Sequence, residues 1–364
     1  MNIGIIVSNI CSGAGTERAV INLANAISEL TNNRVFIISL YSKDREKPFY
    51  EINSDVVLIH LNYKMQSNII SRLVIYKTLL FELKRCHNRY GFSVLMGTTH
   101  AYNCVISCIK GIVRIGCEHI NYDACPKLFR IIRYISYKKL DHVVLLTNDD
   151  KKKYHFLGEG KPVVIPNIRS FYPQTPASLE NKRIISIGRL QMQKGYDILL
   201  DFAGNLRREI PGWKIDIYGE GSMETALKRK IIEKNLVGFI EIKKPIKNIQ
   251  QEIMTSSIYL MTSRNEGLPM VLLEAQACGL PIVSFDCPEG PKDVVRDGVD
   301  GYLIPVGDTD TMMEKIELIS NSNELRKKMG RNARNHSNSF SKEIIVDRWI
   351  KLIEEAIKRR KEII

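Results

Sequence analysis

Short runs of β-branched residues alternate with longer amphipathic stretches along the whole chain, and this alternation limits the possible folds more than any other feature. Repeated strand-helix units predict parallel sheets covered by helices, which is the α/β class. The predicted strands are Ile3–Val7, Val35–Leu40, Val56–Ile59, Ser93–Met96, Ile112–Gly116, His142–Leu146 and Val163–Ile165, and then Arg183–Ile187, Trp213–Tyr218, Ile258–Met261, Pro281–Ser284 and Tyr302–Ile304.

A proline-rich segment divides this pattern. Pro166–Pro176 holds three prolines, which continue neither a helix nor a strand, and the 364 residues are enough for two domains. We therefore predict two Rossmann-like domains, residues 1–168 and 169–340, that face each other across a cleft. The chain is predicted to be helical from about Thr309, with residues 341–364 forming a C-terminal helix that packs back towards the first domain.

The charge is uneven along the chain. Residues 1–170 carry 23 Lys and Arg against 13 Asp and Glu, and the rest carries 30 against 27. The first half is therefore expected to meet an anionic surface or substrate. No apolar run approaches the ~20 residues of a spanning helix, and Met1–Ile10 lacks a basic leader, so neither a membrane span nor export is expected. The eight cysteines show no metal or redox spacing and fit a reducing cytoplasm.

The first candidate site is the loop Cys11–Arg18, directly after the first predicted strand. Gly13 and Gly15 let backbone amides approach a ligand at the start of a helix. A dinucleotide-binding loop would have a third glycine where Arg18 stands, which speaks against NAD or FAD. A tight turn without a ligand is the alternative.

The second candidate site is Gly188–Gly195, after the first strand of the second domain. Arg189 and Lys194 stand at the carboxyl end of that strand, where open α/β sheets bind ligands, and Gly188 begins the loop. Two fixed cations could hold a diphosphate and neutralise the charge that grows on a departing nucleotide. The alternative is that both are solvated loop charges.

The third candidate site is the most specific. Glu266 precedes a helix of about three turns predicted between Pro269 and Gly279, and Glu274 lies within its apolar sequence. A carboxylate is costly to bury there without partners, and ribose hydroxyls would serve as partners. A fourth segment, Ser284–Pro291, either closes over a bound nucleotide or only connects a strand to a helix.

These motifs together resemble glycosyltransferase family 4, the retaining enzymes of the GT-B fold that use nucleotide sugars. The resemblance covers nearly the whole chain and is strongest over Ile184–Pro305. Its hallmark is the pair of glutamates separated by seven residues, met here by Glu266 and Glu274. The stretches Val164–Asn167, Cys117–His119 and Asp297–Pro305 are also similar to family members that build bacterial surface polysaccharides.

The resemblance implies a role for each candidate residue. It implies that Arg189 and Lys194 hold the donor diphosphate, that Glu274 binds the ribose, and that His119 faces the sugar and the acceptor. Glu266 and the amides from Gly267 through Leu268 and Pro269 to Met270 would hold the donor sugar and phosphate. Gly13, Gly15 and Gly188 complete the predicted nucleotide-sugar site, and the catalytic group is predicted to be Glu266, His119, Arg189 and Lys194.

The resemblance also implies that no cofactor and no metal are needed, because cationic side chains and helix dipoles replace the divalent ion in such enzymes. Asp308-Thr309-Asp310 has the spacing of a metal-binding motif, but we predict that it caps a helix. The implied reaction moves a hexose or N-acetylhexosamine, from a donor predicted to be UDP-linked, to a lipid-linked saccharide for capsule, O-antigen or exopolysaccharide. A GT-B sugar-nucleotide epimerase and a basic nucleic-acid-binding protein are the alternatives; no nucleic-acid partner is expected.

Two basic amphipathic segments suggest where the enzyme works. Residues 68–85 and 126–139 place apolar side chains on one face and cations mostly off it, the second segment including Arg130, Arg133 and Lys138. Such helices can lie on anionic bilayers. The expected location is therefore cytoplasmic and peripheral, on the inner face of the membrane, with a polyprenyl-diphosphate-linked saccharide as acceptor. Ordinary core-facing helices with solvated cations are the other interpretation.

Overall fold

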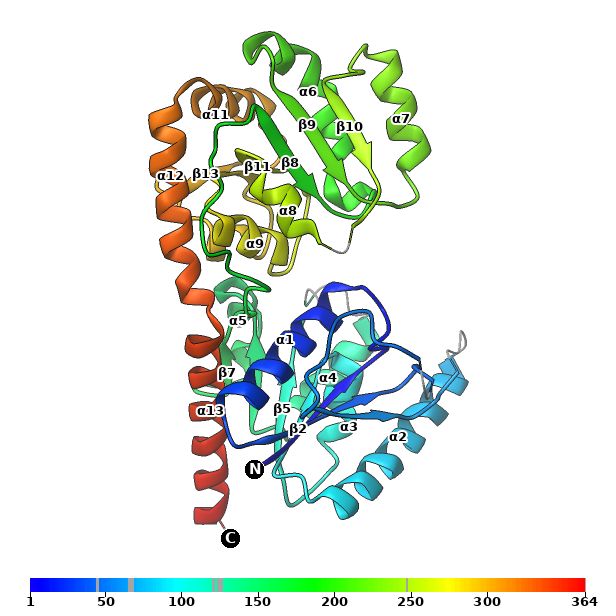
Figure 1. Ribbon diagram of the computed structural model, residues 1–364. Helices are drawn as coiled ribbons and strands as arrows, with labels where there is room; N and C mark the ends of the chain where they lie inside the picture. The colour runs from blue at the N-terminus through cyan, green and yellow to red at the C-terminus, as the bar shows by residue number, and fades with distance from the viewer. Residues whose placement is uncertain (44–45, 65–68, 120–121, 123–126, 247, 364) are drawn as a thin grey trace. The chain divides into compact units, whose positions relative to one another are not determined.

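The computed structural model describes residues 1–43, 46–64, 69–119, 122, 127–246 and 248–363, without the side chains of 69–73, 127–128 and 363. The chain divides into two compact units (Figure 1). Unit 1 is Met1–Ile168 with Ser341–Ile364, and unit 2 is Arg169–Phe340. Each unit holds one parallel sheet with helices, so the predicted α/β class is confirmed. Residue 68 of the first basic segment, residue 126 of the second and one of the eight cysteines, Cys125, lie outside the described part.

The sheet of unit 1 has the strand order β3-β2-β1-β4-β5-β6-β7, and all its pairings are parallel. Strand β1, which has neighbours on both sides, is almost wholly apolar because both faces of the sheet are covered. The strands are β1 Asn2–Val7, β2 Arg34–Ser39, β3 Val57–His60, β4 Val94–Gly97, β5 Val113–Cys117, β6 His142–Leu145 and β7 Pro162–Val164.

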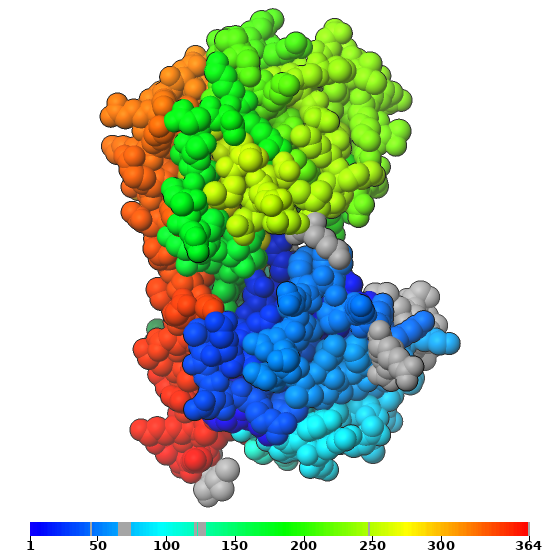
Figure 2. Space-filling model, viewed as in Figure 1, coloured from blue at the N-terminus to red at the C-terminus, as the bar shows by residue number. Residues whose placement is uncertain are grey.

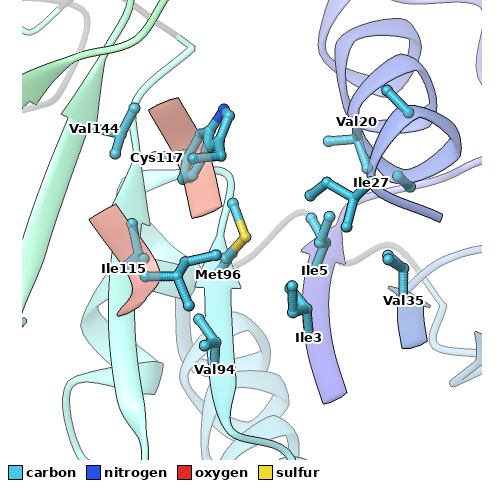
Figure 3. Close-up of a cluster of buried hydrophobic side chains, with 14 of the residues drawn as sticks. Ile3, Ile5, Val20, Ile27, Val35, Val94, Met96, Ile115, Cys117 and Val144 are labelled. Carbon is cyan, nitrogen blue, oxygen red and sulfur yellow. The ribbon is translucent and has the colours of Figure 1, made fainter. Parts of the chain in front are cut away.

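Two layers of helices bury the two faces of this sheet. On one face Val20 and Ile27 point towards Ile3 and Ile5 of β1 (Figure 3). The other face is covered by α2, α3 and α4, with Leu79 and Tyr137 buried in its core, and by Tyr154, which follows α5. The helices are α1 Gly15–Leu30, α2 Ile69–Tyr90, α3 His100–Ile106, α4 Lys127–Tyr137, α5 Asn148–Lys153 and α13 Lys342–Ile363, with a 3-10 turn at His155–Leu157.

The last helix, α13, completes the layer formed by α1. Its residues Ile345, Trp349 and Ile353 are buried in the same core as α1. Arg360 Nε donates to Asp141 Oδ1 at 2.8 Å, which fastens the far end of the helix. In the space-filling view the C-terminal residues lie directly against the N-terminal part of the chain (Figure 2). The chain therefore returns to unit 1 after it has formed unit 2.

The sheet of unit 2 has the order β10-β9-β8-β11-β12-β13. The strands are β8 Arg183–Ile187, β9 Lys214–Tyr218, β10 Ile240–Lys243, β11 Ile258–Met261, β12 Ile282–Phe285 and β13 Gly301–Ile304. Strand β10 was not predicted, because four residues that alternate apolar and charged at a sheet edge are too few to separate from a helix by periodicity.

The helices of unit 2 pack around this sheet, with α6, α11 and α12 contributing to one core. They are α6 Tyr196–Glu209, α7 Glu224–Glu233, α8 Ile249–Met254, α9 Met270–Cys278, α10 Pro291–Val294, α11 Thr309–Asn321 and α12 Asn323–His336, with 3-10 turns at Met192–Lys194 and Ser337–Phe340. None of the helices in the described part is both long and apolar enough to cross a membrane.

Candidate active site

Two of the predicted loops follow neighbouring strands of unit 2. Strand β8 pairs with β9 on one side and with β11 on the other, so the strand order reverses between β8 and β11. Open α/β sheets bind ligands at such a reversal, outside the carboxyl ends of the strands. The loop that begins at Gly188 follows β8, and the loop that leads to Glu266 follows β11, so the topology brings these two predicted sites to one place.

Lys194 and Glu266 meet there directly. The Lys194 ammonium lies 2.6 Å from Glu266 Oε1, and both side chains are largely buried, with 15% and 8% exposed. Ser263 Oγ donates to the same oxygen at 2.6 Å. The cation assigned to a diphosphate therefore already has an anionic partner. An incoming phosphate would share Lys194 with this carboxylate.

Glycines provide the space for this arrangement. A Cβ atom at Gly188 would lie 3.0 Å from Lys194 Cε, so the lysine stem passes over a position where only glycine leaves room. Gly195 adopts a φ of +67° and would place a Cβ 1.9 Å from the Thr262 carbonyl oxygen. These glycines let the two loops lie in direct contact.

Arg264, the residue that joins these two loops, was not predicted from the sequence. Its guanidinium donates to both carboxylate oxygens of Asp197 at 2.8 and 2.7 Å and to the Met192 carbonyl at 2.6 Å. Its backbone amide donates to the Gln193 carbonyl at 2.7 Å. The hydrogen bonds from Arg264 lower the pKa of Asp197. Arg264 thus ties the segment that carries Lys194 to the segment that carries Glu266.

The other donor-side residues divide between the surface and the interior. Arg189 is exposed, whereas Leu268, Pro269 and Met270 are buried and Gly267 is partly exposed. Helix α9 begins at Met270 after Pro269 and ends at Gly279, which has a φ of +79°, as predicted. Glu274 is 0% exposed. Its assignment to a ribose stays a prediction, since no part of that carboxylate reaches the surface in this structure.

The fourth predicted segment packs against the third. The Glu266 amide donates to the Pro288 carbonyl, and a Cβ at Gly290 would lie 1.7 Å from the Gly267 carbonyl oxygen. Burial, and then the negative charge of Glu266, raise the pKa of the Cys287 thiol to about 12. This segment therefore supports the Glu266 loop, whichever of its two predicted roles it has.

In unit 1, the glycine-rich loop leads into α1. Gly13, Ala14 and Gly15 are exposed, and a Cβ at Gly15 would meet open space. Tyr50 Oη donates to the Gly13 carbonyl at 2.9 Å, and the Phe49 ring lies 3.2 Å from the position of a Cβ at Gly13. The loop is held from one side by aromatic residues and presents its backbone on the other.

His119 follows β5 and lines a pocket of unit 1, together with Thr98, Glu118 and Asn167. Apolar side chains from α1, α13 and the strands form most of the remaining wall. Desolvation lowers the pKa of the His119 imidazole to about 4. At neutral pH the ring is therefore uncharged and can donate one hydrogen bond and accept another.

Beneath His119 lies a buried hydrogen-bond network that sequence reasoning missed. Glu118 accepts from Tyr137 Oη and, at 3.0 Å, from Asn103 Nδ2. Asn103 also donates to the Cys117 carbonyl at 3.3 Å, and it fits only because Gly97 and Gly116 carry no side chains. Burial raises the pKa of Glu118. A polar residue on the mainly apolar helix α3 was the only signal for this network.

The predicted sites are thus distributed over both units. Gly13, Gly15 and His119 belong to unit 1, and the other predicted residues belong to unit 2. Asp308 caps α11, since its carboxylate accepts from the Thr311 amide at 3.1 Å. The prediction that the segment Asp308-Thr309-Asp310 caps a helix is thus confirmed for Asp308.

The two parallel sheets, the helices around them and the helical C-terminus define a GT-B fold, as predicted. TarM from Staphylococcus aureus, solved as a mutant with UDP and other ligands, has a TM-score of 0.80 at 16% identity, covering 97% of this chain and 99% of TarM. HepE from Anabaena, solved with UDP and glucose, has a TM-score of 0.77 at 15% identity, covering 98% and 100%.

Sequence comparison points to a glycosyltransferase. Residues 168–336, most of unit 2, match the model described as "Glycosyl transferases group 1". The amylovoran biosynthesis glycosyltransferase AmsD of Erwinia amylovora is 27% identical, over 95% of this chain and 97% of its own. An α-1,4-N-acetyl-D-galactosaminyltransferase of Campylobacter jejuni, named for an acceptor on PP-undecaprenol, is 26% identical, over 98% and 99%.

Proposed function

We propose that this protein is a retaining glycosyltransferase that moves a hexose or N-acetylhexosamine from a UDP-sugar to a polyprenyl-diphosphate-linked saccharide, in the synthesis of capsule, O-antigen or exopolysaccharide. The observation that carries the proposal is the Lys194–Glu266 pair, held at the point where the strand order of unit 2 reverses. The names of AmsD and of the C. jejuni enzyme support the pathway, and the UDP complexes of TarM and HepE support the nucleotide.

The site residues supply the groups that such a transfer needs. Lys194, together with the exposed Arg189, would bind the diphosphate and stabilise the negative charge that develops as the bond from the sugar C1 to the phosphate oxygen breaks. The acceptor hydroxyl oxygen forms the new bond to C1, and its proton passes to the departing phosphate oxygen. Because attack and departure use the same face of the sugar, the anomeric configuration is retained.

The reaction is proposed to need no metal ion. A divalent cation would serve to neutralise the diphosphate, and the side chains of Lys194 and Arg189 carry two positive charges for this purpose. Glu266 would bind the donor sugar once a phosphate has taken its place beside Lys194. We assign unit 2 to the donor, and Gly13, Gly15 and His119 of unit 1 to the acceptor side.

A nucleotide-sugar panel tests the proposal. We expect one UDP-sugar to raise the melting temperature. At a hundredfold excess over Kd, its binding should stabilise the folded protein by about 2.7 kcal/mol. The rise should occur without added Mg²⁺ and should persist in EDTA. With a radiolabelled donor and a polyprenyl-diphosphate saccharide, label should appear in the lipid fraction. An epimerised nucleotide sugar without transfer, or no thermal response to any nucleotide sugar, would contradict the proposal.

We also propose that the protein works at the inner face of the cytoplasmic membrane. The support is the charge of residues 1–170, which carry ten more Lys and Arg than Asp and Glu, as 23 against 13. A lipid-linked acceptor would be held at that surface, and its diphosphate and the anionic headgroups both attract cations. Retention of the protein on anionic vesicles tests this location.

A further inference from the structure

Helix α4 turns its isoleucines outward. Ile131, Ile132 and Ile135 are 61%, 44% and 54% exposed, and Tyr134 beside them is 44% exposed. A helix that packs on a sheet normally buries such side chains, and three together on one helix are not the scattered single residues common on protein surfaces. The alternative interpretation, a helix that turns its apolar face to the core, therefore does not describe these isoleucines of α4.

The inner side of α4 carries a cation instead. Arg133 is 1% exposed, its guanidinium carbon lies 3.9 Å from the centre of the Tyr122 ring, and it donates to the Tyr122 carbonyl at 2.9 Å and to Tyr154 Oη at 3.3 Å. Tyr137, one turn further on, is 0% exposed and donates to Glu118. The sequence-based expectation that Arg133 meets a bilayer is wrong, because this cation holds the helix to the domain.

Cations border the exposed apolar side chains. Lys138 and Lys139 are exposed, and the Lys138 ammonium lies 2.7 Å from Tyr134 Oη and 4.0 Å from the centre of its ring. The sequence from Lys127 to Leu140 contains no Asp or Glu. A helix with an apolar centre, a basic border and no acid of its own matches a surface that is apolar inside and anionic at its boundary.

We propose that the outer face of α4 docks on an anionic lipid bilayer. Ile131, Ile132 and Ile135 enter the boundary between headgroups and acyl chains, and Lys138 and Lys139 stay at the level of the lipid phosphates. This docking surface deepens the proposed location of the enzyme and rests on it. It does not depend on which sugar is transferred.

The other basic helix, α2, is the weaker candidate. Among the side chains of α2 that the structure describes, from Val74 onward, the large apolar ones that are exposed are Val74 and Phe81, at 59% and 78%. They are seven residues apart, and the exposed Lys77 and Thr78 lie between them. Glu82 follows Phe81 directly and forms an ion pair with Arg85 at 3.3 Å. Phe81 is therefore a suitable control residue within the same unit.

Vesicle sedimentation tests the surface, with phosphatidylglycerol and phosphatidylcholine mixtures against phosphatidylcholine alone. We expect the wild type to bind only the anionic vesicles and the double variant Ile131→Ser with Ile135→Ser to bind at least about tenfold more weakly. Lys138→Glu with Lys139→Glu should lose about tenfold at low salt, and less as salt screens the charges. Phe81→Ser and, in unit 2, Ile232→Ser, which removes an isoleucine that is 66% exposed, should bind like the wild type.

Each outcome has one meaning. Equal vesicle binding by the wild type and both α4 double variants overturns the proposal, as does a concentration-dependent dimer that the isoleucine variant abolishes while vesicles remain unbound. The melting temperature and the donor-induced thermal shift of each variant report folding and donor binding. Vesicle binding without any donor-induced thermal shift would contradict the proposed function but not the α4 docking surface. A donor-induced thermal shift without vesicle binding would contradict only the docking surface.

Discussion

The two units prepare their predicted sites by different physical means. In unit 2 a lysine and a glutamate form an ion pair, and hydrogen bonds between loops hold their segments together. In unit 1 the predicted histidine is neutral, and the polar groups beneath it are buried and hydrogen-bonded to one another. Unit 2 suits a charged ligand that competes for a cation, whereas unit 1 suits hydroxyl groups that exchange hydrogen bonds.

Removing the central cation should have the largest effect. We expect Lys194→Ala to lower kcat/KM about 1,000-fold. The variant lacks the positive charge that would neutralise the diphosphate, and it leaves Glu266 without its ionic partner. Steady-state kinetics with the donor found in the thermal panel measure this. As a control, Lys228→Ala removes an exposed lysine that pairs within α7 and should change kcat/KM less than about twofold. Comparable activity of both variants would end the donor-side assignment.

The neutral histidine of unit 1 should appear in the pH dependence of stability. The pKa of His119 is about 4 in the folded protein, and the ordinary value of 6.5 applies to the unfolded chain. Between these two pH values the unfolded chain therefore binds a proton that the folded chain does not. Stability is thus lost as pH falls from about 6.5 to about 4, by up to about 3 kcal/mol.

The variant His119→Gln isolates this contribution. Urea unfolding at pH 7.5 and 4.5 should show a smaller loss of stability in the variant than in the wild type. His155→Gln serves as the control, because that side chain is largely exposed and lies in the same unit. Identical pH slopes for wild type and His119→Gln would contradict the neutral imidazole.

The contact between the loops of unit 2 should affect catalysis because it positions Lys194 and Glu266, and not because Arg264 binds the ligand. We expect Arg264→Ala to lower kcat/KM about 30-fold, as the segments that carry Lys194 and Glu266 move apart. In a double-mutant cycle, Asp197→Ala should have little further effect in the Arg264→Ala background, since the two side chains act as one pair. Full additivity of the two losses would show that the pair does not position the site.

The smallest effect concerns the network beneath His119. Tyr137→Phe removes one hydrogen bond to the buried Glu118 and should lower the free energy of unfolding by about 1–2 kcal/mol. Tyr134→Phe on the exposed side of α4 is the matched control and should change it by less than about 0.5 kcal/mol. Denaturant unfolding of both variants separates a structural network from a solvated hydroxyl.

Much of the fold was predictable because β/α alternation is a local signal. The runs around Ile5 and Ile37 are apolar throughout, since their strands are covered on both faces, and Pro269 and Gly279 mark the ends of α9 by backbone geometry alone. Lys194 and Glu266 were predictable as site residues because each follows a strand. Their direct contact was not, because it depends on β8 and β11 being neighbours.

The sequence by itself determined the α/β class, the positions of most strands and the chemical types of the candidate site residues, because these depend on patterns within a few residues. The tertiary structure alone decided which residues support the site and which side of each helix is buried. Arg264 meets Asp197, and Arg133 turns inward while Ile131 turns outward, through packing between segments distant in sequence. The helical periodicity of α4 predicts which of its residues share a face. Which of the two faces is exposed depends on the neighbouring residues Tyr122 and Tyr154, whose rings lie against Arg133.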